Sequence, residues 1–181
     1  MNDKARATCE SVIRDTGIEA GHTVLDFGCG IGHYTIPAAK QVGHHGTVYA
    51  IDSNGSKLKE LSEAARQEHV GNVIKPYHTN GELALELPSA CIDVVLLYDV
   101  FWYFRLGEQL RVLLREMRRL LKADGLLSVF PEHIDVSALQ REIEDAGFQL
   151  QRHRICEVFH DDNIESGKIF TFKKASPEDH E

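Results

Sequence analysis

The sequence predicts an α/β fold: a doubly wound, mostly parallel seven-stranded sheet with helices on both faces and a C-terminal antiparallel hairpin. Strand-like and helical periods alternate from the start of the chain to Ala146. A glycine-rich turn joins the first strand to the next helix, because glycine accepts the backbone conformations of a tight turn. Between residues 148 and 174 two β-like runs follow each other without a helix, and strands joined so briefly must be antiparallel.

Each expected element follows from its own pattern. The fourth strand is apolar on both parities apart from Asp93, which is typical of a strand covered on both faces. Pro37 is compatible with a helix if it lies in the first turn, where its missing N–H has no partner. The expected parallel strands are residues 23–27, 47–52, 72–77, 92–98 and 125–130, the helices are 3–16, 32–42, 54–68, 106–122 and 136–146, and the hairpin strands are 148–159 and 168–174 with a loop over 161–167.

The composition is that of one globular domain, expected to span residues 1–174, with residues 1–20 as an N-terminal helix and lid. Of the 181 residues, 43% are hydrophobic and 27% are charged. No apolar run approaches the ~20 residues that span a bilayer. Four widely spaced cysteines favour free thiols in a reducing cytoplasm, where we expect the protein. Residues 175–181 are polar and acidic, and we expect this tail to be disordered.

The charge balance bears on the partners of the protein. The net charge is −8, from 28 acidic and 20 basic residues. Affinity for nucleic acid depends on neutralising phosphates, so an acidic chain without a basic tail is a poor general binder. The sequence therefore disfavours a nucleic-acid partner and predicts no membrane partner.

The most informative segment is residues 24–32, an apolar strand that runs through Asp26 into Gly28, Gly30 and Gly32. Such a turn should lead into a helix whose free N–H groups face a ligand. Asp52 follows twenty positions later, at the end of the second strand. A carboxylate there can accept both hydroxyls of a ribose. The pattern predicts a ligand that contains adenosine.

The spacing of the glycines separates two kinds of ligand. A nicotinamide dinucleotide site usually reads G-x-G-x-x-G, whereas this turn reads G-x-G-x-G. Asp26 beside the turn would repel a pyrophosphate, but it suits a ligand with an ammonium or sulfonium cation. A nicotinamide oxidoreductase would also need a substrate domain for which no sequence remains.

At these residues the chain resembles the class I S-adenosylmethionine-dependent methyltransferases, over residues 17–147 and more loosely to Lys174. The resemblance implies that the seventh strand is reversed and inserted between the fifth and the sixth. It also implies S-adenosylmethionine as the cofactor. Gly28, Gly30 and Gly32 would line its methionine part, Asp26 would reach its ammonium, and Asp52 its ribose.

Other donor contacts follow from the same resemblance, with one departure. Ser53 and Asn54 would flank the adenine, or else they would cap the next helix. Tyr34, just after the glycine turn, is placed to touch the donor. After the third strand the family usually has an Asp for the adenine amino group, whereas this chain has Asn80 followed by Gly81. The amide oxygen of Asn80 is the expected substitute.

The acceptor side is expected after the fourth and fifth strands. Asp99 matches the family pattern after the fourth strand, and the aromatic side chains of Trp102 and Tyr103 can hold a flat apolar substrate and attract a sulfonium. The alternative is that the neighbouring phenylalanines are core and Trp102 packs under the N-terminal helix. His133, after the fifth strand, can take a proton from an acceptor hydroxyl or amine, although a surface histidine is the commoner case.

A metal site is not predicted. His153, Cys156 and His160 with Asp161 have ligand-like spacing. Strand alternation, however, sends residue 153 to one face and residues 156 and 160 to the other. No local signature supports a Ser/His/Asp or Cys/His nucleophile either.

These observations predict a methyltransferase that moves a methyl group from S-adenosylmethionine to a small molecule, or to a protein side chain, by in-line displacement. Because little is inserted into the minimal fold, we expect the N-terminal helix and the loops at 99–105 and 131–134 to close the site. Either a sizeable acceptor or a second subunit, as in a homodimer, would complete the cover. The alternative is a non-catalytic S-adenosylmethionine-binding regulatory or scaffold protein.

Overall fold

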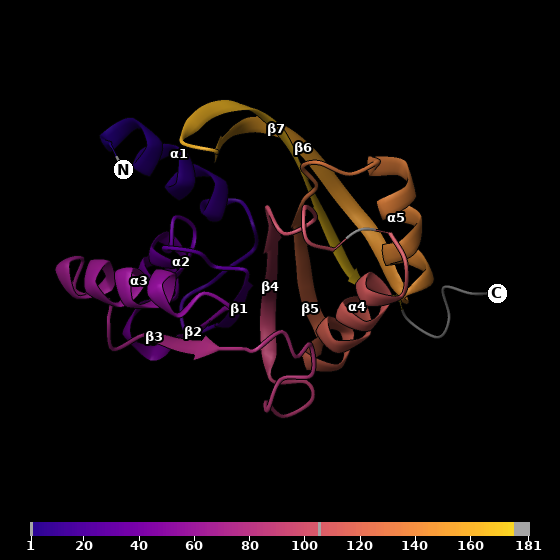
Figure 1. The fold of residues 1–181 in the computed structure, drawn as a ribbon, viewed down its shortest axis with the longest axis horizontal. Helices are drawn as coiled ribbons and strands as arrows, with labels where there is room; N and C mark the ends of the chain where they lie inside the picture. Colours follow the sequence, from indigo (N-terminus) through magenta and orange to yellow (C-terminus); the bar gives the residue numbers. More distant parts are fainter. Residues whose placement is uncertain (1, 105, 176–181) are drawn as a thin grey trace.

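The computed structural model of the protein describes residues 2–104 and 106–175. Figure 1 shows helices on both sides of a central sheet, with the C-terminal hairpin arching across one end of it. The elements in chain order are α1 (Asp3–Arg14), β1 (Thr23–Phe27), α2 (Thr35–Val42), the 3-10 turn η1 (Gly43–His45), β2 (Thr47–Asp52), α3 (Gly55–Gln67), β3 (Ile74–His78), β4 (Ile92–Tyr98), α4 (Glu108–Leu120), β5 (Leu121–Phe130), α5 (Val136–Asp145), β6 (Phe148–His160) and β7 (Asn163–Lys174).

The seven strands form one sheet in the order β3-β2-β1-β4-β5-β7-β6. The first five strands are parallel to one another, and β7 runs antiparallel to both β5 and β6. The predicted fold class is confirmed, including the reversed strand between the fifth and the sixth. The strand order switches between β1 and β4, so the carboxyl ends of these two strands border the crevice where doubly wound folds bind ligands.

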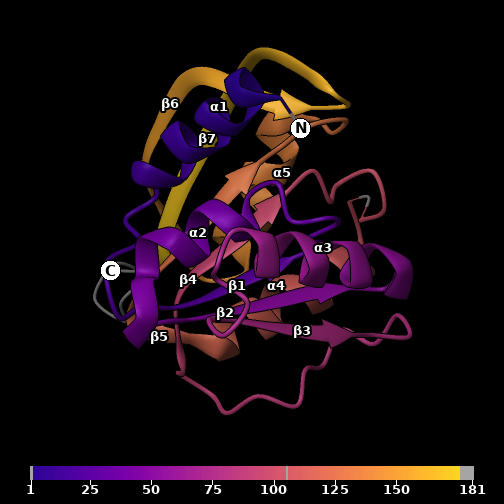
Figure 2. The same cartoon turned by 90° about the vertical axis from the view of Figure 1, so that its left-hand side faces the viewer.

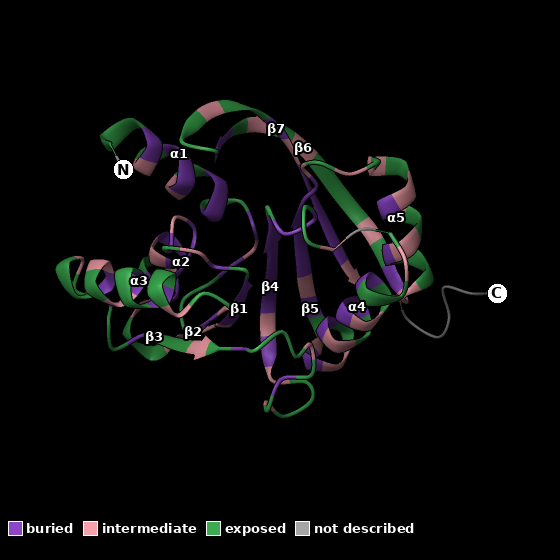
Figure 3. Cartoon of the chain, in the orientation of Figure 1, coloured by how far each residue is buried: buried purple, intermediate pink, exposed green. Residues whose placement is uncertain are grey.

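Side chains alternate between two apolar layers along the central strands. On β4, Val94 and Leu96 pack with α1, α2 and α3, whereas Val95 and Leu97 pack with α4 and α5. Figure 2 shows α2 and α3 in front of the sheet, and Figure 3 shows that β4 is largely buried. The one charged residue of β4, Asp93, accepts hydrogen bonds from Lys122 Nζ at 2.7 Å and Thr23 N at 2.8 Å. The expectation of a strand covered on both faces is confirmed.

Most expected bounds hold within two or three residues, with two exceptions. β5 begins at Leu121, directly after α4, rather than at residue 125. The loop expected over residues 161–167 is wrong, since only Asp161 and Asp162 form the turn and β7 already begins at Asn163. Both aspartates have positive φ, 45° and 60°, as a two-residue turn of type I′ requires. Because α2 begins at Thr35 rather than at residue 32, Pro37 is its third residue and meets the condition for a proline in the first turn.

The hairpin extends beyond the sheet and towards α1. β5 pairs only with the last part of β7, from Phe170 to Lys173, so the tip of the hairpin pairs with itself. Arg154 holds it against α1 by donating to Asp15 Oδ2 at 2.6 Å and Val12 O at 2.8 Å. The tip therefore lies over the carboxyl ends of the strands (Figure 1). Within the described ranges, no helix is both long and apolar enough to cross a membrane.

Candidate functional site

The glycine turn follows β1 and is fixed by the end of β2. Gly28 N and Cys29 N donate to Ile51 O at 2.8 and 3.0 Å. All three glycines of the turn have positive φ, which favours glycine over any residue with a Cβ. The segment therefore adopts the tight turn that its spacing predicts.

The three glycines have different surroundings. A Cβ on Gly28 would lie 2.5 Å from Val100 Cγ1, and one on Gly32 would lie 2.2 Å from Leu61 Cδ1. A Cβ on Gly30 would have no atom within 4 Å among the described residues. Gly28 and Gly32 thus allow close packing of the protein itself, whereas Gly30 borders open space that a ligand can fill.

Asp52 ties this turn to the end of β2. Its Oδ2 accepts from Gly30 N at 2.8 Å and its Oδ1 accepts from Asn54 N at 2.7 Å. Each carboxylate oxygen has a second lone pair, so both can still accept a hydroxyl. The side chain of Asn54 caps α3 by accepting from Ser56 N at 3.0 Å, which fulfils the capping alternative for this residue. Ser53 is exposed beside it.

Asp26 is buried beneath the turn, with 3% of its surface exposed. Its Oδ2 accepts from Thr35 Oγ1 at 2.6 Å. Burial raises the pKa of Asp26 to about 6, with a smaller contribution from Asp52, while the hydrogen bond from Thr35 opposes the shift. At neutral pH the group is therefore an ionised carboxylate with little solvent around it, and it is poised to favour a nearby cation.

Tyr34 has an anchoring role. Its hydroxyl donates to Phe159 O and accepts from Phe159 N, both at 3.1 Å. Its ring meets Tyr98 edge-on at 4.9 Å between centroids. Because the hydroxyl donates one hydrogen bond to the backbone of β6 and accepts another from it, Tyr34 connects the glycine turn to the tip of the hairpin.

The loop after β3 lies beside Asp52. Thr79 N donates to Asp52 O at 3.1 Å, and the next two residues, Asn80 and Gly81, are exposed. Asn80 N donates to Glu82 Oε2 at 2.8 Å, which leaves its side-chain amide outside this contact. The predicted adenine residues thus follow directly on Thr79, which contacts the backbone carbonyl of Asp52 at the end of β2.

The aromatic segment after β4 is divided between core and surface. Phe101 is 1% exposed and belongs to the core, as the alternative interpretation proposed for it. Trp102 and Tyr103 are 64% and 73% exposed, so Trp102 does not pack under the N-terminal helix. The Trp102 ring meets the ring of His133 edge-on at 5.0 Å between centroids. The two predicted acceptor-side loops therefore lie next to each other.

His133 also lies against His160, which the sequence did not predict as part of a site. Its Nε2 is 3.1 Å from His160 Nε2, and His160 Nδ1 is 3.2 Å from Asp99 Oδ2. Burial raises the pKa of Asp99, an effect that His160 opposes. Strand alternation relates only residues of the same strand. The approach of His160 on β6 to the segments after β4 and β5 has no local signal in the sequence, so the sequence did not predict this cluster.

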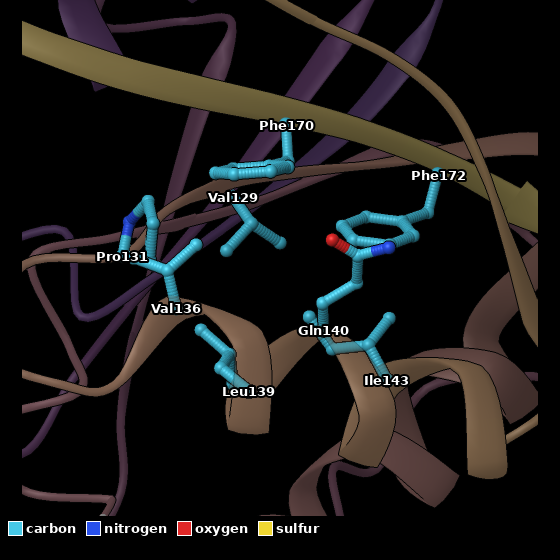
Figure 4. A pocket seen from close by; sticks show the side chains of 8 residues that line it. All are labelled: Val129, Pro131, Val136, Leu139, Gln140, Ile143, Phe170 and Phe172. Carbon is cyan, nitrogen blue, oxygen red and sulfur yellow. The ribbon is translucent and has the colours of Figure 1, made fainter.

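Two cavities lie near these elements. The one in Figure 4 separates Leu139 and Ile143 of α5 from Phe170 and Phe172 of β7, and its volume of about 10 Å³ is room for a single water. The other, of about 210 Å³, borders the glycine turn at Gly32 and His33, and α1, α2 and α3 form its walls. Ion pairs that join these helices surround it, with Glu68 contacting Arg6 at 2.6 Å and Lys40 at 3.0 Å.

The strand order, the glycine turn after β1 and the acidic residue that closes β2 define a nucleotide-binding α/β protein with a reversed last strand. The chain matches the family described as "Methyltransferase domain" over residues 25–129. It belongs to this family, and the predicted membership of the class I S-adenosylmethionine-dependent methyltransferases is confirmed.

Individual proteins agree with this assignment. The chain is 30% identical over 117 residues to a demethylmenaquinone methyltransferase of Geobacillus kaustophilus, covering 65% of the chain and 48% of the relative. It is 33% identical over 134 residues to the ubiquinone/menaquinone biosynthesis C-methyltransferase UbiE of Marinomonas sp., covering 74% and 51%. The fold matches a SAM-dependent methyltransferase from Aquifex aeolicus with a TM-score of 0.74 at 23% identity, over 92% and 89% of the two chains. The chain spans about half the length of the two curated relatives.

Proposed function

We propose that the chain binds S-adenosylmethionine and transfers its methyl group to a small-molecule acceptor by in-line displacement. Family membership supports the donor, and the two relatives, a demethylmenaquinone methyltransferase and a ubiquinone/menaquinone biosynthesis C-methyltransferase, favour a small acceptor. The observation that carries the proposal is the open space at Gly30 beside the Asp52 carboxylate, at the strand-order switch.

The donor side is assigned from the contacts of the turn. Asp52 accepts the ribose hydroxyls on its remaining lone pairs, and Gly30 leaves room for the methionine part. Asp26 is too buried to contact the donor over a large surface. Its carboxylate instead attracts the ammonium and sulfonium charges of the donor from beneath the turn. The adenine lies between the exposed segments after β2 and β3, against Ser53, Asn80 and Gly81.

The acceptor is held by the exposed aromatic segment after β4. Trp102 and Tyr103 offer flat apolar surface next to His133. The acceptor's lone pair forms a bond to the methyl carbon while the carbon–sulfur bond breaks and its electron pair goes to sulfur. We assign the lid role to α1, since its Arg6 and Glu10 line the cavity that borders the glycine turn.

Donor binding is tested by thermal melting with S-adenosylmethionine, S-adenosylhomocysteine and NAD⁺. The donor should stabilise the protein by ~2.7 kcal/mol at a hundredfold excess over its Kd. Asp52→Asn should bind it at least about tenfold more weakly, because a hydrogen bond to a charged group contributes ~1.5–3 kcal/mol. Asp124→Asn, an exposed change at the opposite end of β5, is the matched control.

The outcomes separate the candidate functions. Stabilisation by NAD⁺ alone would overturn the donor assignment. Transfer of labelled methyl from the donor to a demethylated quinol or to a metabolite extract would identify an enzyme. Donor binding without any transfer would instead favour the regulatory or scaffold alternative.

A further inference from the structure

Three segments that are distant in sequence bring two imidazoles and a carboxylate together beside the acceptor side. Asp99 follows β4, His133 follows β5, and His160 ends β6 at the hairpin tip. One potential ligand atom from each of the three lies within 4.8 Å of the other two. The hairpin that contributes His160 passes over the ends of β4 and β5 (Figure 1).

His160 is the best-buried member and carries an unpaired polar atom. Its side chain is 6% exposed, and its Nδ1 makes no hydrogen bond within the described part of the chain. Asp99 Oδ2 is 3.2 Å away, an ion pair if the imidazole is charged but a contact outside hydrogen-bond geometry. A buried polar atom without a partner costs ~1–3 kcal/mol, so this nitrogen calls for a ligand.

The other nitrogen of His160 has a neighbour that suits a metal ligand. Its Nε2 lies 3.1 Å from His133 Nε2 and 3.4 Å from Asp161 Oδ2. Metal-binding histidines commonly donate their second ring N–H to a carboxylate, which fixes the tautomer and increases the basicity of the ligating nitrogen. The backbones of Asp99 and His133 have positive φ, 58° and 61°, in the left-handed region that Asp and His adopt more readily than most other non-glycine residues.

We propose that Asp99, His133 and His160 bind a divalent first-row transition-metal ion. Two imidazoles and one carboxylate suit Zn²⁺ or Fe²⁺, whereas Mg²⁺ and Ca²⁺ prefer sets made of oxygen alone. Three protein ligands leave coordination positions open, as in metal sites that bind a substrate.

The metal site lies beside the acceptor side, so the ion could activate the acceptor for methyl transfer. This role rests on the proposed function. An acceptor hydroxyl or thiol bound at an open position would lose its proton to solvent more readily. Its lone pair would then attack the methyl carbon as described above. His133 would act as a metal ligand in place of its expected role as a proton acceptor.

The test is zinc titration of the chelator-treated full chain by calorimetry, with Co²⁺ absorption as a second readout of the ligand set. One Zn²⁺ per chain is expected. Asp99→Asn, His133→Gln and His160→Gln should each weaken binding by about a hundredfold, and Asp161→Asn by about tenfold. His153→Gln, an exposed histidine on the same strand as His160, should bind zinc as the wild type does.

Three results would overturn the assignment. Zinc affinity unchanged in Asp99→Asn and His160→Gln would show adventitious binding only. Loss of binding in Glu165→Gln, with Asp99→Asn unaffected, would move the site to the neighbouring group of Glu132, His160 and Glu165. Less than one ion per chain in the wild type would leave no site.

The zinc titration needs separate controls for the folding of the variants and for donor binding. Asp99 is half-exposed and asparagine tolerates positive φ, so Asp99→Asn remains informative if His160→Gln fails to fold. Donor binding is measured on the same preparations. Zinc binding without donor binding would reject the proposed function alone, and donor binding without zinc would reject the metal site alone.

Discussion

The donor side and the acceptor side of the crevice are built from different kinds of contact. The donor side, made of the glycine turn and the segments after β2 and β3, is held by hydrogen bonds between the ends of neighbouring parallel strands, such as Gly30 N to Asp52. The acceptor side, made of the segments after β4 and β5 and the hairpin tip, depends on contacts that the C-terminal hairpin supplies, such as His160 with His133 and Phe159 with Tyr34.

The two sides also differ in how completely their polar groups are paired. Both carboxylate oxygens of Asp52 and the Asp26 carboxylate accept hydrogen bonds from the protein. On the acceptor side His160 Nδ1 is buried and unpaired among the described residues. A buried polar group without a partner calls for an explanation, and the proposed metal ion supplies one on the acceptor side.

The largest effect is expected from the glycine turn. Gly32→Ala should cost about 4 kcal/mol of unfolding free energy, because the new Cβ combines a left-handed backbone with overpacking against Leu61. Gly30→Ala, whose Cβ enters open space, should cost only about 1 kcal/mol but should weaken donor binding. Urea denaturation and calorimetry measure the two effects. Equal destabilisation by both changes would show that the glycines do not divide into packing and ligand positions.

The second effect concerns the carboxylate beneath the turn. Asp26→Asn should stabilise the protein by about 3 kcal/mol at neutral pH and should weaken donor binding, since it removes a buried charge that favours the cation. Folding raises the pKa of Asp26 from 3.8 to about 6, so the wild type loses stability as the pH rises through this interval. The gain of the variant should therefore vanish below pH 4. A gain that is independent of pH would contradict the buried-charge explanation.

The smallest effect tests the link between the two sides. Tyr34→Phe should cost about 2 kcal/mol, because it leaves the N–H and C=O of the buried Phe159 without their partner. Hydrogen exchange should accelerate at the hairpin tip and leave β1 and β2 unchanged. Tyr77→Phe, a half-buried tyrosine of β3, should stay within about 0.5 kcal/mol of the wild type. Unchanged exchange at the tip would show that Tyr34 does not anchor it.

The sequence predicted those parts whose determinants are local. Periodicity located the strands and helices, and the spacing of Gly28, Gly30 and Gly32 before Asp52 predicted the turn and its carboxylate. It missed the two-residue turn at Asp161 and Asp162, although two consecutive residues that tolerate positive φ were a usable signal.

The sequence by itself determined the fold class and the donor turn, because glycine conformations and apolar periods act over a few neighbouring residues. Only the tertiary structure decided that Tyr34 holds the hairpin and that Asp99, His133 and His160 meet. Strand alternation describes one strand at a time. Which side chains meet across β4, β5 and β6 depends on how far the hairpin reaches beyond the sheet, and that reach is set by strand pairing between distant segments.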